Sequence, residues 1–290
     1  MQRAVTLTRT VWFILFVAAV AQLAGCTTVA GKHSVEKAGS AGVSALSATS
    51  HIPPAQLQAL LHTTFNDAKS AVAGFTGVNL SRILMTLADA DQVTHLIRSS
   101  LDESLANDLP DKTLRSRLIN DMATDQASSV LALYSPGQKA ILIQPDNVKK
   151  YLSQSNSRSQ QRKAVLALFV HELLHAADDY RYNAFGGNDA TYAEKVARSA
   201  VIEGHAQLQT RRLCLKLHCN AAFNRLNRYM FARTEIDSRA LAYHQNRHLQ
   251  NLEFIYKEGE RFVSALSART NSRTNSQTCL LYTSPSPRDS

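Results

Sequence analysis

The sequence predicts a mainly α fold with one small β-hairpin or sheet, which is an α+β arrangement. Apolar residues recur at helical spacing along much of residues 53–278, and only two short runs near the middle are rich in β-prone residues. A turn-rich segment of hairpin length separates these two runs. Once both ends of the chain are set aside, about 250 residues remain, which is enough for one domain with its own core.

Helices are expected wherever the helical period of apolar residues persists. The first such pattern opens at a Pro-Pro pair, and the second carries Leu80, Ile83, Leu84, Leu87 and Ala88 on one face. We therefore expect this second face to pack in the core. The expected helices cover residues 53–70, 80–105, 112–127, 163–182, 190–213 and 235–256.

The β-prone runs lie at residues 130–134 and 140–143, and the loop between them contains Ser, Pro and Gly. This pattern predicts a hairpin just before the helix expected at 163–182. An edge strand in that place can hold an extended peptide through main-chain hydrogen bonds. An ordinary structural hairpin is the alternative.

The first 26 residues have the pattern of a targeting segment. Arg3 and Arg9 supply positive charge, and residues 11–21 form an apolar run that is too short to cross a bilayer as a stable helix. The run leads into Leu-Ala-Gly-Cys at residues 23–26, which resembles the lipobox of bacterial lipoproteins. The resemblance implies cleavage before Cys26 and lipid attachment to it, which would anchor the protein to a membrane. An uncleaved anchor helix or a soluble secreted protein is the alternative.

The segments that flank the domain carry further expectations. Thr27 follows the cysteine, and the resemblance then implies the outer membrane of the cell envelope, facing the periplasm. Residues 27–52, rich in Ala, Ser, Gly and Thr, predict a flexible tether. Residues 279–290 resemble a translated sequencing adapter, so we place the domain at 53–278 and expect the natural C-terminus to be missing. A disordered Ser/Pro tail is the alternative.

The distribution of basic residues does not predict binding to nucleic acid. The formal net charge is +9, or +7 without Arg3 and Arg9, and the basic residues are scattered along the chain. This scatter indicates solvated surface charge, with contact to anionic lipid headgroups as the alternative.

Two cysteines remain once Cys26 and Cys279 are set aside. Cys214 and Cys219 are five positions apart, so they do not share one face of a regular helix. An oxidising periplasm would permit a disulfide between them, provided that the helix ends between the two residues. Two free buried thiols are the alternative.

A metal-binding motif lies within the apolar helix expected at 163–182. His171-Glu172-Leu173-Leu174-His175 is an HExxH sequence, and residues four apart lie on one helical face, so both imidazoles can reach one tetrahedral ion. Glu172 lies next to that face, where it can contact a water at the metal. Two core histidines beside a stray glutamate are the alternative.

The third ligand is expected from the helix at 190–213. Glu203 supplies the carboxylate that a His2Glu zinc site requires, and the fourth position stays open for water. His205 is the rival ligand, but it projects about 200° away from Glu203 on a regular helix, so both cannot bind one ion. Gly204 costs about 1 kcal/mol in a helix, which indicates close packing, for instance against the HExxH helix.

These residues together resemble a known family, the gluzincin-type metallopeptidases of bacteria with motifs HExxHA…D and EGxA. A hairpin precedes the zinc helix in those proteins, and residues 255–263 look like their Tyr-x-x-Gly-x-x-Phe-Val segment, here with Tyr256 and Gly259. The resemblance covers residues 130–266. It implies a zincin-like domain and Zn²⁺ as the cofactor, with a peptide or protein as the substrate.

The resemblance also suggests supporting residues. Asp179 matches the family's aspartate and is expected to orient a zinc-bound histidine, with Asp178 as its neighbour and a solvated helix end as the alternative. A second donor to the oxyanion is expected from one of several side chains, although each of them has a surface or core role as its alternative. These candidates are His205, Tyr243, His244, His248 and Tyr256.

The chemistry expected from these residues is hydrolysis of a peptide bond, with Glu172 as the general base. A noncatalytic envelope lipoprotein with a structural zinc site is the main alternative, and the presence of Glu172 argues against it, because a structural site needs no base. A zinc carrier is a third possibility, but the chain has no His-rich loop.

Overall fold

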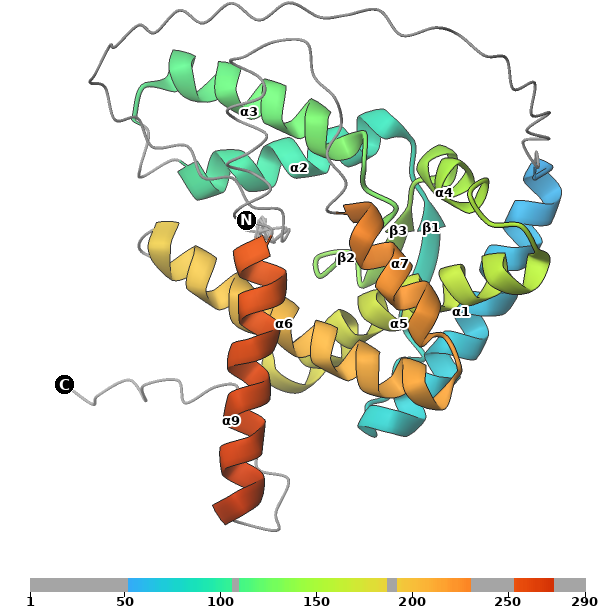
Figure 1. Ribbon diagram of the computed structural model, residues 1–290. Helices are drawn as coiled ribbons and strands as arrows, with labels where there is room; N and C mark the ends of the chain where they lie inside the picture. Colours follow the sequence, from blue (N-terminus) through green and yellow to red (C-terminus); the bar gives the residue numbers. More distant parts are fainter. Residues whose placement is uncertain (1–51, 106–109, 187–191, 231–252, 274–290) are drawn as a thin grey trace, which may run out of the picture.

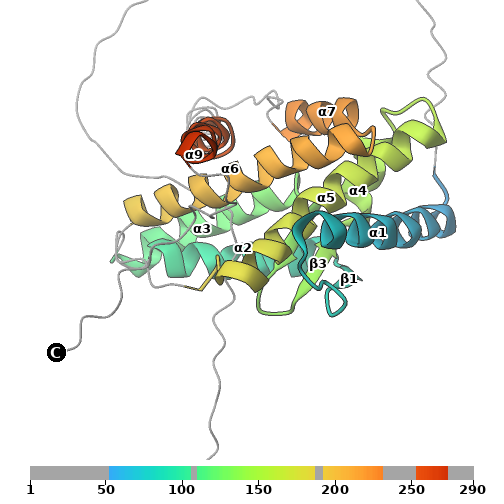
Figure 2. The same ribbon diagram turned by 90° about the horizontal axis from the view of Figure 1, so that it is seen from below.

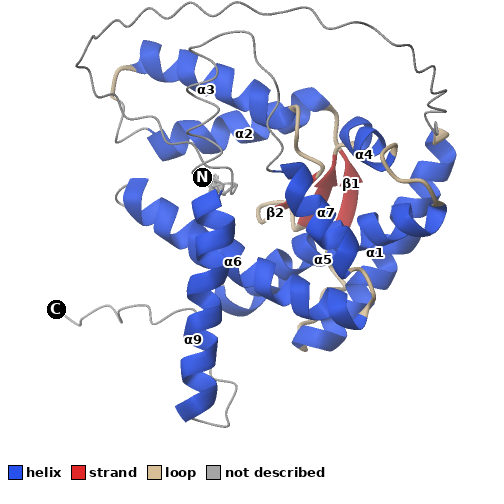
Figure 3. Cartoon of the chain, viewed as in Figure 1, coloured by secondary structure: helices blue, strands red, loops and turns tan. Residues whose placement is uncertain are grey.

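The computed structural model describes residues 52–105, 110–186, 192–230 and 253–273 (Figure 1). These residues form a mainly helical structure with a small three-stranded sheet (Figure 3), so the expected α+β class is confirmed. No helix in these ranges is both long and apolar enough to cross a membrane. The elements in chain order are α1 (Pro54–Thr76), β1 (Leu84–Leu87), α2 (Ala90–Leu105), α3 (Lys112–Ala127), β2 (Ala132–Ser135), β3 (Ala140–Ile143), α4 (Pro145–Leu152), α5 (Arg158–Tyr182), α6 (Tyr192–Lys216), α7 (Asn220–Met230), the π-helix η1 (Phe254–Glu258) and α9 (Gly259–Arg273).

The sheet has the strand order β1-β3-β2. Strands β2 and β3 form the expected antiparallel hairpin, in which Tyr134 is the partner of Ile141. Strand β1 runs parallel to β3 on its other side, and Leu84 is the partner of Ala140. Strand β2 is therefore an edge strand, and it is the strand that packs against α5.

The helix expected at 80–105 is wrong in its first part, because residues 84–87 form β1 instead. Leu84 and Leu87 are exposed, so they do not belong to a core-facing helical stripe. Helix α2 begins later, where the Asp89 side chain accepts from the N–H of Gln92 and the Gln92 side chain accepts from the N–H of Asp89. This reciprocal capping fixes the start of the helix and leaves the preceding residues free to pair with β3.

Strand β3 separates two apolar cores, because alternate residues of a strand point to opposite faces. Ile141 and Ile143 belong to the larger core, which contains α1, α4, α5 and α7. Ala140 and Leu142 belong to the smaller core, built mainly with α2 and α3. All four residues of β3 are buried, which explains its unbroken apolar sequence.

Helix α5 runs through the larger core, in contact with α1 and α6 (Figures 1 and 2). Its start is capped by Ser157, whose side chain accepts from the N–H of Gln160, and it ends at Asn183 in the left-handed conformation. Every residue from 164 to 179 is buried, so the apolar residues on all sides of this helix meet neighbouring elements.

Helices α6 and α7 are joined by a short turn, and a disulfide links the last part of α6 to this turn. Cys214 and Cys219 are bonded to each other, and α6 ends at Lys216, between the two cysteines. The helix expected at 235–256 lies almost entirely outside the described residues, and its last part, residues 254–256, belongs to the π-helix η1.

Candidate metal centre

His171, His175 and Glu203 lie together in the interior, where helices α5 and α6 pack against each other. The Nε2 atoms of the two histidines are 3.2 Å apart, and each lies 3.2 Å from Oε2 of Glu203. The three side chains and the neighbouring Glu172 are between 2% and 7% exposed. The three atoms thus form a buried triangle with nearly equal sides.

The dimensions of this triangle suit a metal ion. Nitrogen and oxygen ligands about 2.0–2.1 Å from a tetrahedral zinc ion lie about 3.3–3.4 Å from one another. Oε2 of Glu203 has no hydrogen-bond partner of acceptable geometry despite its burial. A buried acceptor without a donor is costly, and a cation at the triangle would satisfy it. The group formed by His171, His175 and Glu203 can therefore hold a metal ion.

The charges of these groups are strongly coupled. Burial by itself would raise the pKa of Glu203, but the two histidines lower the pKa of this carboxyl group to about 2. Burial opposes the protonation of His175, yet the negative charge of Glu203, 3.2 Å away, raises the pKa of His175 above its usual value. The Glu203 side chain thus remains negative at neutral pH, as a metal ligand must.

Glu172 lies beside the triangle but is held by strand β2. The N–H of Tyr134 donates to Oε2 of Glu172 at 2.8 Å. Burial raises the pKa of Glu172 to about 7; the negative charge of Glu203 adds to this rise, while His171 and the Tyr134 N–H oppose it. A carboxyl group with such a pKa can both accept and release a proton near neutral pH.

The Nδ1 atoms of the two histidines, which face away from the triangle, do not bond to the expected carboxylate of Asp179. Nδ1 of His171 lies 3.5 Å from the hydroxyl oxygen of Thr210, and Nδ1 of His175 has no hydrogen-bond partner. Asp179, which the sequence suggested for this role, accepts instead from the hydroxyl of Tyr134. Asp179 also contacts Lys139 in the turn of the hairpin, so its carboxylate serves the hairpin.

His205 lies outside the ligand triangle. Its Nδ1 is 2.7 Å from Oδ2 of Asp178, and its Nε2 is 3.1 Å from Nε2 of Gln209. His205 thus joins α6 to α5 through a carboxylate that follows the HExxH motif. The helical rotation that argued against His205 as a ligand also accounts for this direction.

Tyr256 covers the triangle from η1. Its ring stacks on that of His171 with centroids 6.2 Å apart, and its hydroxyl bonds to Glu203. Burial, the negative charges of Glu203 and Glu172 and this hydrogen bond raise the pKa of Tyr256 well above its usual value. The hydroxyl therefore keeps its proton. Of the two expected oxyanion donors that the structure describes, His205 and Tyr256, Tyr256 is the one that lies at the ligands.

A contact between two glycines brings η1 and α9 to this position. A Cβ atom on Gly204 would lie 2.2 Å from the carbonyl carbon of Gly259, and one on Gly259 would lie 2.1 Å from the carbonyl oxygen of Ala200. Close packing at Gly204 was expected, but its partner is the start of α9 rather than α5. Sequence reasoning connected Gly259 to the site only through the family resemblance, because the contact joins segments more than fifty residues apart.

Sequence reasoning also missed Phe185 and Thr210. The Phe185 ring lies between those of His175 and Tyr134, with centroid distances of 6.0 and 5.7 Å. Neither residue belongs to a motif, and only their positions in space connect them to the site. Cys26, Tyr243, His244 and His248 lie outside the described residues.

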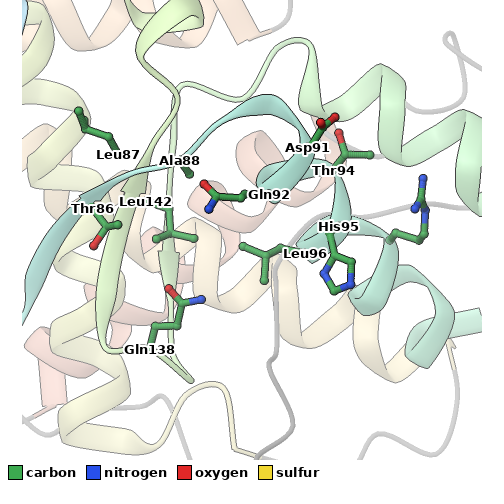
Figure 4. Close-up of a pocket in the computed structure, with 11 residues that line it drawn as sticks. Thr86, Leu87, Ala88, Asp91, Gln92, Thr94, His95, Leu96, Gln138 and Leu142 are labelled. Atoms are coloured by element: carbon green, nitrogen blue, oxygen red, sulfur yellow. The ribbon is translucent and has the colours of Figure 1, made fainter.

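A cavity of about 680 Å³ lies elsewhere, between strand β1, helix α2 and the turn of the hairpin (Figure 4). Gln92 and His95 from α2, Gln138 from the turn and Leu142 from β3 line it with other residues. None of the three candidate ligands is among its lining residues.

Comparison with protein-family models, curated proteins and solved structures found no match.

Proposed function

We propose that this protein is a zinc-dependent peptidase of the bacterial cell envelope, with a zincin-like domain anchored through a lipid on Cys26. The observation that carries the proposal is the triangle of His171, His175 and Glu203 with Glu172 next to it. Two imidazoles and one carboxylate form a donor set that suits zinc and leaves a coordination position open. Magnesium and calcium prefer sites made of oxygen ligands alone.

The reaction proposed for this site is hydrolysis of a peptide bond. A bound zinc ion supplies Lewis acidity toward the substrate carbonyl and lowers the pKa of water. Glu172 accepts a proton from the attacking water and later delivers it to the leaving amine. Tyr256 keeps its proton, and we propose that its hydroxyl, which bonds to Glu203 in this structure, donates instead to the negative charge that develops on the carbonyl oxygen when substrate is bound.

The edge of strand β2 is the proposed place for the substrate backbone. In the antiparallel pair the N–H of Gln144 donates to the carbonyl of Leu131, so alternation along β2 points the main-chain groups of Ala132 and Tyr134 away from β3. The N–H of Tyr134 already donates to Glu172, so an extended peptide would pair with this edge through the carbonyl of Tyr134 and the main-chain groups of Ala132. Strand β2 packs against α5, and its Tyr134 bonds to Glu172, so a peptide held there passes close to the base.

A noncatalytic protein with a structural metal site is the alternative, and the deep burial of all four side chains favours it. Structural zinc sites, however, have four protein ligands as a rule, whereas the described residues supply three ligands at this position. A structural site also has no use for a carboxylate beside the metal.

The test compares protein from residue 27 onward with its Glu172→Gln variant. Metal content is measured by mass spectrometry after zinc loading, and hydrolysis is measured on a broad peptide library. We expect one zinc per chain in both proteins and activity only in the wild type, because Gln keeps the size of Glu but cannot act as a base. Asp67→Asn, which removes an exposed carboxylate paired with Arg162, is the control and should keep both properties.

Zinc in both proteins without hydrolysis of any peptide would favour the structural alternative. Absence of bound zinc from the wild type would contradict the proposal altogether.

A further inference from the structure

Tyr134 bonds to two carboxylates of α5 through two different groups. Its main-chain N–H donates to Oε2 of Glu172 at 2.8 Å, and its side-chain hydroxyl donates to Oδ2 of Asp179 at 2.8 Å. Glu172 and Asp179 are seven residues apart, about two helical turns, so they lie on the same face of α5. A single residue of the edge strand is thus bonded to α5 at two positions, about two helical turns apart.

The N–H of Tyr134 is free to serve Glu172 because of its place in the sheet. It points away from β3, and β2 is an edge strand, so no strand among the described residues accepts from it. Tyr134 is buried, and a buried N–H without an acceptor costs about 1–3 kcal/mol. Glu172 is the acceptor that the fold provides, and the carboxylate gains a charge-assisted bond in return.

Asp179 fixes the rest of the hairpin to the end of α5. The ammonium group of Lys139, in the turn between β2 and β3, lies 2.5 Å from the same Oδ2 atom and 5.2 Å from the ring of Tyr180. The Tyr134 ring also packs against Phe185 just beyond α5. The position of β2 relative to α5 is therefore set by the hydroxyl of Tyr134 together with Lys139.

We propose that Tyr134 is a positioning residue for the general base, an inference that rests on the proposed function. Its N–H holds one carboxylate oxygen of Glu172, and the other oxygen then has a fixed direction for proton transfer. The bond from the Tyr134 hydroxyl to Asp179 fixes the position of strand β2 along α5. In this position the N–H of Tyr134 can donate to Glu172. Asp179 thereby acts on Glu172 through Tyr134.

The first measurement does not depend on activity. In zinc-loaded protein with 15N-labelled tyrosine, the amide signal of Tyr134 is assigned by its loss in Tyr134→Phe. We expect Glu172→Gln to move this signal, because a neutral amide replaces the carboxylate that accepts from it. We expect Asp179→Asn to move it as well, since this change weakens the bond that sets the strand. The amide signals of Tyr151 and Tyr229, whose rings pack against each other, should stay in place.

The second measurement is kinetic. We expect Tyr134→Phe to lower kcat about tenfold, which is part of the about 100- to 10,000-fold that general base catalysis contributes. KM and zinc content should change less than about twofold, because binding and metal ligation are kept. Tyr151→Phe, which removes another buried tyrosine hydroxyl, is the matched control and should keep the wild-type kcat.

A rise in KM at unchanged kcat would overturn the inference, because Tyr134 would then serve substrate binding alone. An amide signal that Glu172→Gln leaves in place would overturn it too. If the wild type binds zinc but hydrolyses no peptide, the proposed function fails, and the amide shifts still decide whether Tyr134 holds Glu172.

Discussion

The two faces of the small sheet bury very different side chains. On the face toward α5, the Tyr134 side chain bonds to the buried carboxylate of Asp179, and at the edge of the same strand its N–H bonds to Glu172. The two histidines of the candidate metal centre lie in the same helix as these carboxylates. On the other face, Leu133 and Leu142 pack against aliphatic residues of α2 and α3. Buried charges are costly unless they are paired, so the first face is built around specific partners, whereas the second needs only volume and apolarity. We therefore expect substitutions on the first face to change metal binding and chemistry, and those on the second to change stability alone.

The largest effect is expected at Glu203. Loss of a residue that merely orients a metal ligand costs about 10–100-fold in affinity, so Glu203→Gln, which removes a ligand, should cost more than about 100-fold. Isothermal titration with zinc measures this loss. Glu260→Gln is the matched control, because Glu260 is paired with Arg211 beside α6 and is not part of the triangle. Equal affinity of Glu203→Gln and wild type would show that the carboxylate is not a ligand.

The next largest effect is expected on protein stability, from a substitution in the apolar core between the sheet and helices α2 and α3. Ile97 of α2 is fully buried in the smaller core, and Ile97→Ala should lower the free energy of unfolding by about 2–5 kcal/mol through lost burial and the cavity left behind. Urea unfolding measures this loss, and zinc titration of the folded variant should give the wild-type affinity. A weakened zinc affinity in the folded variant would break the comparison, because it would show that the two faces are coupled.

The smallest effect is expected where α9 crosses α6. Gly204→Ala would press a methyl group against the backbone of Gly259, so we expect a loss of about 1–3 kcal/mol in the free energy of unfolding. Gly74→Ala in α1 is the matched control, because nothing lies within 4 Å of the added atom, and it should gain about 0.4–1 kcal/mol. Urea unfolding of both variants decides the matter. Equal stabilisation by the two changes would mean that the contact between the glycines is not close.

The sequence by itself determined the features that depend on local spacing. The helix at 112–127 begins after Asp111, whose side chain caps it, and it was predicted with its observed bounds. The hairpin follows from two short β-prone runs around a turn, and the HExxH spacing alone places both histidines on one face of α5. In each case a few neighbouring residues carry the whole signal.

Only the tertiary structure decided the features that join distant segments. Residues 84–87 carry a helical pattern, but hydrogen bonds to β3 make them a strand. Asp179 could have faced an imidazole or solvent, and the position of the hairpin gives it Tyr134 and Lys139 instead. Such partners depend on how elements far apart in the chain pack together. Local propensity and residue spacing do not predict this packing.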